Sequence, residues 1–279
     1  MMTGGMPEAD WELVAMEHLA ELGWFPADGR QIAKGSGERE SWNELIIPGR
    51  LRDAITRINP KLPSSAVDEV LTTVMTATSR DALNENHRTH EYLTRRIRSV
   101  VYTDEYGAEQ NPTVWLIDRR HPDSNDFLVA NQVTVVDGEH KRRFDIVLYV
   151  NGMPLGFVEL KKAGDDSDDL KYARNQLATY ARELPLAFRC NVACVVSDGT
   201  SALSACCAAT SPPTGYRGMT SGRRSAPPSN GCSPSMVTHR MARMARRSSS
   251  SSRWRPSPRN GRPKSAISQV GWAIDQCRV

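Results

Sequence analysis

Residues 200–279 are almost without acidic side chains. Asp275 is the single one, against twelve arginines and one lysine. Because the whole chain carries a formal net charge of +4, the acidic excess lies in residues 1–199. A segment rich in serine and proline, without periodic apolar residues, cannot bury enough apolar surface to offset its ordering entropy. We therefore expect residues 1–199 to fold as one domain and residues 200–279 to form a disordered, low-complexity tail.

Other absences exclude whole classes of protein. No apolar run approaches the roughly 18 residues of a membrane span, and no charged-then-apolar leader is visible, so neither a membrane protein nor an exported one is expected. The phosphate-binding pattern G-x-x-x-x-G-K-[ST] occurs nowhere, which excludes a motor of that type. Cys190 and Cys194 fall in an apolar run, and the other four cysteines lie in the tail without metal-binding spacing. A reducing cytoplasm fits this usage.

The first 199 residues carry the patterns of an α/β domain. Apolar residues at helical spacing predict helices over 9–22, 51–58, 66–77 and 170–184, the last preceded by four aspartates that suit a helix N-terminus. Apolar and β-branched runs predict strands over 100–102, 113–117, 126–129, 132–136 and 191–197. Together they indicate a central mixed sheet flanked by helices.

The most informative stretch is a predicted β-hairpin. Two apolar runs, 146–150 and 155–158, are joined by Asn151-Gly152, the strongest short-range hairpin signal. A turn centred on Gly152 places Asp145 directly opposite Glu159, with Cβ atoms about 4.5–5.5 Å apart. Lys161 projects from the same face as Glu159 because side chains alternate along a strand. Both faces of the hairpin are apolar, which predicts a covered, central position. Strict alternation puts Val147, Tyr149, Leu155 and Phe157 on one face and Ile146, Leu148, Val150 and Val158 on the other.

Two facing carboxylates repel each other and are costly to bury unpaired. A divalent cation such as Mg²⁺ removes this conflict, since it takes hard oxygen ligands and keeps several waters. A lysine beside a metal-bound water can orient or activate that water. The alternative is an ordinary ion-paired hairpin end, in which Lys161 neutralises one of the two acids.

Several separated sequence segments resemble those of one protein family. The Asp145…Glu159-x-Lys161 hairpin, followed by a helix and a strand, resembles the PD-(D/E)xK nuclease core. The sequence is most similar to the N-terminal nuclease domain of the restriction (R) subunit of type I restriction–modification enzymes. The matching phrases lie, in order, at residues 8–12, 22–24, 38–42, 49–52, 58–60, 125–132, 143–161, 176–180 and 195–199. The resemblance covers about residues 8–200 and is specific because many phrases recur in order.

The resemblance implies a restriction-endonuclease-like core that cleaves double-stranded DNA with Mg²⁺. It makes Asp145 and Glu159 the metal ligands and Lys161 the residue that orients or activates the attacking water. It also implies the methyltransferase and specificity subunits of a type I complex as partners. ATP enters only through translocase domains, which this chain lacks.

The resemblance further suggests residues that support the site. Gln176 and Tyr180 match the family's Gln-x-x-x-Tyr motif and would support the site or contact the DNA backbone. The alternative, which helical spacing alone favours, is a solvated glutamine and a core tyrosine. Glu12 is the candidate for a glutamate that the family carries on its first helix; a solvent-facing acid is the alternative. Arg142 and Arg143 could contact phosphates, or simply end a basic strand.

The sequence departs from the family in two respects. Phe144 stands where the motif name has proline, a position that is not chemically required. Lys162-Ala163 replaces the family's usual residues after the lysine.

The only close histidine pair, His87 and His90, has no cysteine nearby and is not expected to bind zinc.

Alternatives to a type I nuclease domain stay open. The basic tail is either an arm that binds DNA phosphates or an out-of-frame translation of GC-rich DNA, which we favour. A genuine arm would favour a stand-alone nuclease of the same superfamily. A non-catalytic DNA-binding or assembly module would use the acids structurally. An inactive truncated remnant would fold without meeting its partners.

Overall fold

The computed structural model describes residues 7–161, 167–197 and 202–206. Its main element is a six-stranded mixed sheet in the order β1-β4-β5-β6-β7-β8. These strands are β1 (Phe25–Asp28), β4 (Phe127–Asp137), β5 (His140–Val150), β6 (Met153–Leu160), β7 (Ala193–Ser197) and β8 (Ala202–Cys206). β1 runs parallel to β4 and β6 parallel to β7, whereas the other neighbours are antiparallel. A separate short ladder pairs β2 (Tyr102–Thr103) with β3 (Glu109–Gln110).

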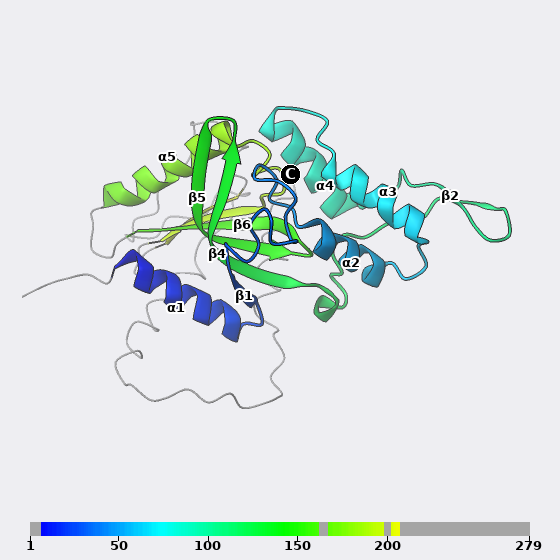
Figure 1. Cartoon of the computed structure of the whole chain (residues 1–279), viewed down its shortest axis with the longest axis horizontal. Coiled ribbons are helices and arrows are strands. Elements are labelled where there is room, and N and C mark those ends of the chain that lie inside the picture. The colour runs from blue at the N-terminus through cyan, green and yellow to red at the C-terminus, as the bar shows by residue number, and fades with distance from the viewer. Residues whose placement is uncertain (1–6, 162–166, 198–201, 207–279) are drawn as a thin grey trace, which may run out of the picture.

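Helices cover both faces of the sheet, which confirms the expected α/β architecture. They are α1 (Glu8–Glu21), α2 (Pro48–Ile58), α3 (Ser64–Met75), α4 (Ala82–Arg95) and α5 (Ser167–Glu183), with a 3₁₀ turn at Pro122–Ser124. In Figure 1 the sheet lies between α1 and α5. Apolar residues of α1, α2 and α3 share one buried cluster, and those of α5 belong to a second cluster. In the part of the chain that the structure describes, no helix has the length and apolar character needed to span a membrane.

Most expected elements are present, and the errors have physical causes. The helices expected over 9–22, 51–58 and 66–77 are α1, α2 and α3. The strand expected over 113–117 is wrong, because only Val114 pairs there, in an isolated bridge with Ile97. Helix α4 was missed because it buries polar Glu85 and Asn86, which breaks the apolar periodicity. The expected tail lies outside the described residues, apart from β8 at its start.

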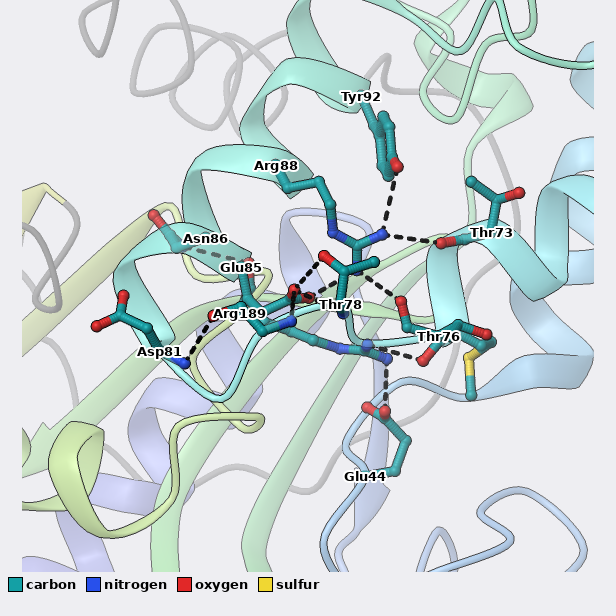
Figure 2. Close-up of polar contacts among 12 residues, drawn as sticks. Glu44, Thr73, Thr76, Thr78, Asp81, Glu85, Asn86, Arg88, Tyr92 and Arg189 are labelled. Carbon is teal, nitrogen blue, oxygen red and sulfur yellow. Dashed lines mark hydrogen bonds and ion pairs between the residues drawn. The ribbon is translucent and has the colours of Figure 1, made fainter.

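Buried polar contacts fasten α3 and α4 to the loop between α5 and β7 (Figure 2). Arg189 donates to the Met75 carbonyl over 2.8 Å and forms an ion pair with Glu44. Burial raises the pKa of Glu44, although the neighbouring Arg189 opposes the shift. Asn86 Nδ2 donates to the carbonyl of Asn191 over 2.8 Å. These contacts satisfy the polar groups that are buried at this edge of the core.

The turn between β5 and β6 is the expected Asn151-Gly152 pair. Both residues have positive φ, +53° and +75°, as a type I′ hairpin turn requires. The turn is buried: Asn151 donates to the Leu116 carbonyl over 2.8 Å, and Ile47 N donates to the Gly152 carbonyl over 2.9 Å. The hairpin end is therefore anchored to the start of α2.

Replacing Gly152 by alanine should lower the free energy of unfolding by about 2 kcal/mol, from positive φ and overpacking together. A Cβ at Gly152 would lie 2.5 Å from the Ile47 carbonyl oxygen. Gly107→Ala is the matched control, because Gly107 has a φ of +78° with nothing near its Cβ position. Urea unfolding of both variants measures the difference. An equal loss in both would show that the contact with Ile47 contributes nothing.

Candidate active site

A β-bulge sets which residues face each other across the hairpin. Near the turn, Val150 pairs with Met153 and Tyr149 with Pro154. Beyond the bulge, Leu148 pairs with Gly156 and Ile146 with Val158, so Leu155 is the extra residue on β6. Continuing this register places Asp145 opposite Glu159, as expected. A hairpin without the bulge would place Val158 opposite Asp145 and turn Glu159 to the other face.

The bulge also corrects one expectation about the hairpin faces. Leu155 was expected on the face of Val147 and Phe157. It packs instead in the α1-side cluster, with Ile146 and Val150, because the extra residue reverses the alternation at this point. Phe157 returns to the α5 side, and two residues further on Glu159 reaches α5 as well.

A second irregularity lies at the level of Asp145 itself. The residues packed on the α5 side are Leu128, Ala130, Val133 and Val135 of β4 and Phe144, Val147 and Tyr149 of β5. Their spacing widens from two to three at Asn131–Gln132 on β4 and at Asp145–Ile146 on β5. Gln132 has a φ of +53°, in the left-handed region that a non-glycine residue rarely adopts. Strained backbone of this kind often accompanies functional sites.

The three residues of the Asp…Glu-x-Lys motif meet at the end of β6. Asp145 Oδ2 accepts a hydrogen bond from the Leu160 backbone N–H over 2.8 Å. Lys161 Nζ donates to Glu159 Oε1 over 3.1 Å. The Glu159 side chain is 4% exposed and that of Lys161 19%. The structure thus holds a carboxylate almost wholly buried beside a cation, with a second carboxylate on the neighbouring strand.

Helix α5 adds two further groups to this site. Gln176 Nε2 donates to Glu159 Oε1 over 2.7 Å and to the Tyr180 hydroxyl over 2.6 Å. Burial raises the pKa of Tyr180, and the negative Glu159 raises it further, while the hydrogen bond from Gln176 lowers it. Tyr180 therefore stays a neutral hydroxyl. Both residues of the Gln-x-x-x-Tyr pattern face the Asp…Glu-x-Lys hairpin.

Glu12 lies on α1, on the other face of the sheet from α5, and contacts β4 beside Asp145. Its Oε1 accepts from Asn131 Nδ2 over 2.6 Å, and its other oxygen accepts from Gln132 Nε2. Gln132 stands in β4 between the pairs Asn131↔Ile146 and Val133↔Phe144, so it is in register with Asp145. Glu12 is therefore bound to the strand next to Asp145, rather than facing solvent.

The two arginines before Asp145 have different surroundings. Arg142 is paired with Glu183 of α5, and its guanidinium lies 5.5 Å from the centroid of the Tyr180 ring. Arg143 is exposed on the strand. Of the two, only Arg143 has an exposed side chain.

The residues present fit a hard cation. Asp145 and Glu159 are each oriented by hydrogen bonds from neighbouring groups, as proteins orient oxygen ligands. Two carboxylates suffice for Mg²⁺, which usually keeps several waters. Within residues 7–161, 167–197 and 202–206, no group of three or more His, Cys, Asp or Glu could hold a metal ion. His90 Nε2 lies 3.3 Å from the Asn191 carbonyl oxygen, and burial lowers the pKa of His90.

Three polar residues near the site were missed in the sequence. Asn131 and Gln132 form a polar pair between apolar runs of β4. Glu183 follows Tyr180 by three positions and Gln176 by seven, the spacing of one helix face. The polar pair in β4 and the helical spacing of Glu183 are both visible in the sequence. The sequence does not show which residues these side chains contact.

Comparison with known proteins gives the family. The model of the type I restriction enzyme R protein N terminus matches residues 5–206. A type I restriction enzyme HindI endonuclease subunit of Haemophilus influenzae is 33% identical over 69% of this chain. A putative type I restriction enzyme MjaIXP endonuclease subunit of Methanocaldococcus jannaschii is 30% identical over 67% of it. The chain covers 18% of the length of each of these relatives.

Both the family match and the relatives agree with the resemblance to type I R subunits that the separated sequence segments indicate. The match extends over the hairpin, α5 and β7 and ends with β8. The chain belongs to the family of type I restriction enzyme R proteins, of which it carries the N-terminal domain.

Proposed function

We propose that this chain carries the DNA-cleaving site of a type I restriction enzyme. Asp145 and Glu159 would hold Mg²⁺, and Lys161 would orient or activate the water that attacks the phosphodiester. The bound metal would polarise the phosphoryl oxygen and lower the pKa of its water. Double-stranded DNA is the proposed substrate, and the names of the relatives, endonuclease subunits of type I restriction enzymes, support this choice.

One observation carries the proposal. Glu159 Oε1 accepts hydrogen bonds from both Lys161 and Gln176, one strand away from Asp145. Burying a carboxylate is unfavourable unless it is paired, and an ordinary hairpin end would leave the acid in water. A buried, oriented acid beside a second acid and a lysine suits metal-dependent hydrolysis better than a surface ion pair.

The partners proposed for the chain follow from its family. A type I enzyme contains methyltransferase and specificity subunits, and we propose that this domain acts inside such a complex. The ATP-driven translocase would be supplied by parts outside the 18% of the relatives that this chain covers. Gln176, Tyr180 and Glu12 would position the site, and Arg143 would contact the DNA backbone.

Binding of Mn²⁺, a spectroscopic substitute for Mg²⁺, tests the proposal without the rest of the complex. Electron paramagnetic resonance of the full chain should detect bound Mn²⁺. Asp145→Asn and Glu159→Gln should each weaken it by at least about tenfold, since ligand charge governs affinity for hard cations. Glu139→Gln, an exposed acid in the β4–β5 turn, should not. Unchanged affinity in both site variants would refute the assigned ligands.

A further inference from the structure

The end of α5 is tied to β5 by an ion pair. Arg142 Nε donates to Glu183 Oε2 over 2.7 Å, and Arg142 Nη2 lies 2.6 Å from the same oxygen. His140 Nδ1 lies 3.9 Å from the other oxygen of Glu183. The Arg142 side chain is 32% exposed and that of Glu183 20%. A cation at a helix C-terminus is also favoured by the helix dipole.

The same guanidinium touches the aromatic part of the site. Its carbon lies 5.5 Å from the centroid of the Tyr180 ring, within the range of a cation–π contact. The Tyr180 ring also meets Phe144 edge-on, with ring centroids 5.7 Å apart. Tyr180 therefore contacts both Arg142 and Phe144, two residues of the strand that carries Asp145.

Tyr180 links Arg142 and Phe144, through Gln176, to the buried Glu159 carboxylate. The Gln176 amide donates both to the Tyr180 hydroxyl and to Glu159 Oε1. Gln176, Tyr180 and Glu183 lie on one face of α5, spaced four and three residues apart. A continuous set of contacts thus runs from Arg142 through Tyr180 and Gln176 to Glu159.

We infer that Arg142 and Glu183 are positioning residues for the cleavage site. They fasten the last turn of α5 to β5 and so hold the Gln176 amide against Glu159. The inference rests on the proposed function, because it concerns the same carboxylate. It replaces the expectation that Arg142 contacts a DNA phosphate, since its guanidinium is already engaged by Glu183 and Tyr180.

Charge removal and charge exchange test this role. Arg142→Gln and Glu183→Gln should each speed hydrogen exchange of the Gln176 side-chain amide in nuclear magnetic resonance. Each should also weaken Mn²⁺ binding by about tenfold, the usual size of a lost contact behind a metal ligand. The double variant Arg142→Glu with Glu183→Arg should recover much of both properties. Arg182→Gln, a neighbouring exposed charge on α5, should alter neither.

Affinity for duplex DNA, measured by fluorescence anisotropy, separates the two roles of Arg142. For a positioning residue, Arg142→Gln keeps DNA affinity and the exchanged pair regains Mn²⁺ binding. If Arg142 contacts a phosphate instead, Mn²⁺ binding stays normal in every variant, and the exchanged pair binds DNA more weakly than Arg142→Gln does. That result would overturn the inference. A wild-type chain that binds no Mn²⁺ contradicts the proposed function instead. The Gln176 exchange rates then still decide whether Arg142 orders α5.

Discussion

Replacing Lys161 by alanine should lower the rate of DNA cleavage by about a thousandfold, within the range that a positioned proton-transfer group contributes. Affinity for double-stranded DNA should stay close to wild type, since Lys161 is directed to Glu159 and mostly buried. Cleavage of plasmid DNA measures the rate, with this domain carried in a full-length R protein that includes the translocase and is assembled with the proposed partner subunits, Mg²⁺ and ATP. Fluorescence anisotropy measures the DNA affinity. Cleavage at the wild-type rate would contradict the assignment of Lys161.

Two further variants guard this experiment against misfolding. Removing the cation leaves Glu159 buried, which is itself destabilising. Lys161→Gln keeps a hydrogen-bond donor for Glu159 without the charge and should fold better, yet remain inactive. Lys61→Ala removes an exposed lysine just after α2 and should cleave normally. Activity in Lys161→Gln would show that the lysine only stabilises the buried acid.

Replacing Glu85 by glutamine should lower the free energy of unfolding by about 3–5 kcal/mol at neutral pH, the usual cost of breaking a buried ion pair. Glu85 is 1% exposed. One of its oxygens accepts from the Thr78 and Ser79 backbone N–H groups, and the other pairs with Arg88 at 2.6 Å (Figure 2). Glutamine would turn an NH₂ group toward Arg88, donor against donor. Urea unfolding measures the loss.

The loss should depend on pH in a definite direction. Burial alone would raise the pKa of Glu85, but hydrogen bonds from Arg88, Thr78 and Ser79 hold it below its usual 4.5. A carboxylate whose folded pKa is lowered contributes stability above its unfolded pKa and loses that contribution as pH falls through the folded value. The difference in unfolding free energy between wild type and Glu85→Gln should therefore be full above pH 4.5 and shrink below it.

An exposed pair on the same helix provides the control. Glu91 and Arg95 form an ion pair at 3.0 Å, with side chains 43% and 79% exposed. Glu91→Gln should cost less than about 0.5 kcal/mol, because solvent screens such pairs. If both variants lost the same stability, burial of Glu85 would not be the cause.

The hairpin illustrates how far the sequence could lead. Asn151-Gly152 predicted the turn correctly, because these residues tolerate positive φ. Opposition of Asp145 and Glu159 was also expected, but for an incomplete reason. The turn alone sets a register that separates the two acids. The bulge at Leu155 shifts the register by one residue, and continuing the shifted register places Asp145 opposite Glu159.

The helix covering the site was predictable in position but not in its contacts. Apolar spacing indicated a helix ending near Leu184, and α5 ends at Glu183. Periodicity alone makes Gln176 and Glu183 solvent-facing polar residues. Only their neighbours on β5 and β6 show that one holds Glu159 and the other holds Arg142.

The sequence by itself determined the α/β class, the buried turn and the family, because these depend on local conformation, on apolar spacing and on phrases that recur in order. The tertiary structure alone decided the register at Asp145, the partner of Arg142 and the binding of Glu12 to β4. Each of these depends on contacts between residues distant in the chain. The number of residues between two strands, including one bulged residue, sets the face on which a side chain lies, and apolar periodicity does not encode that count.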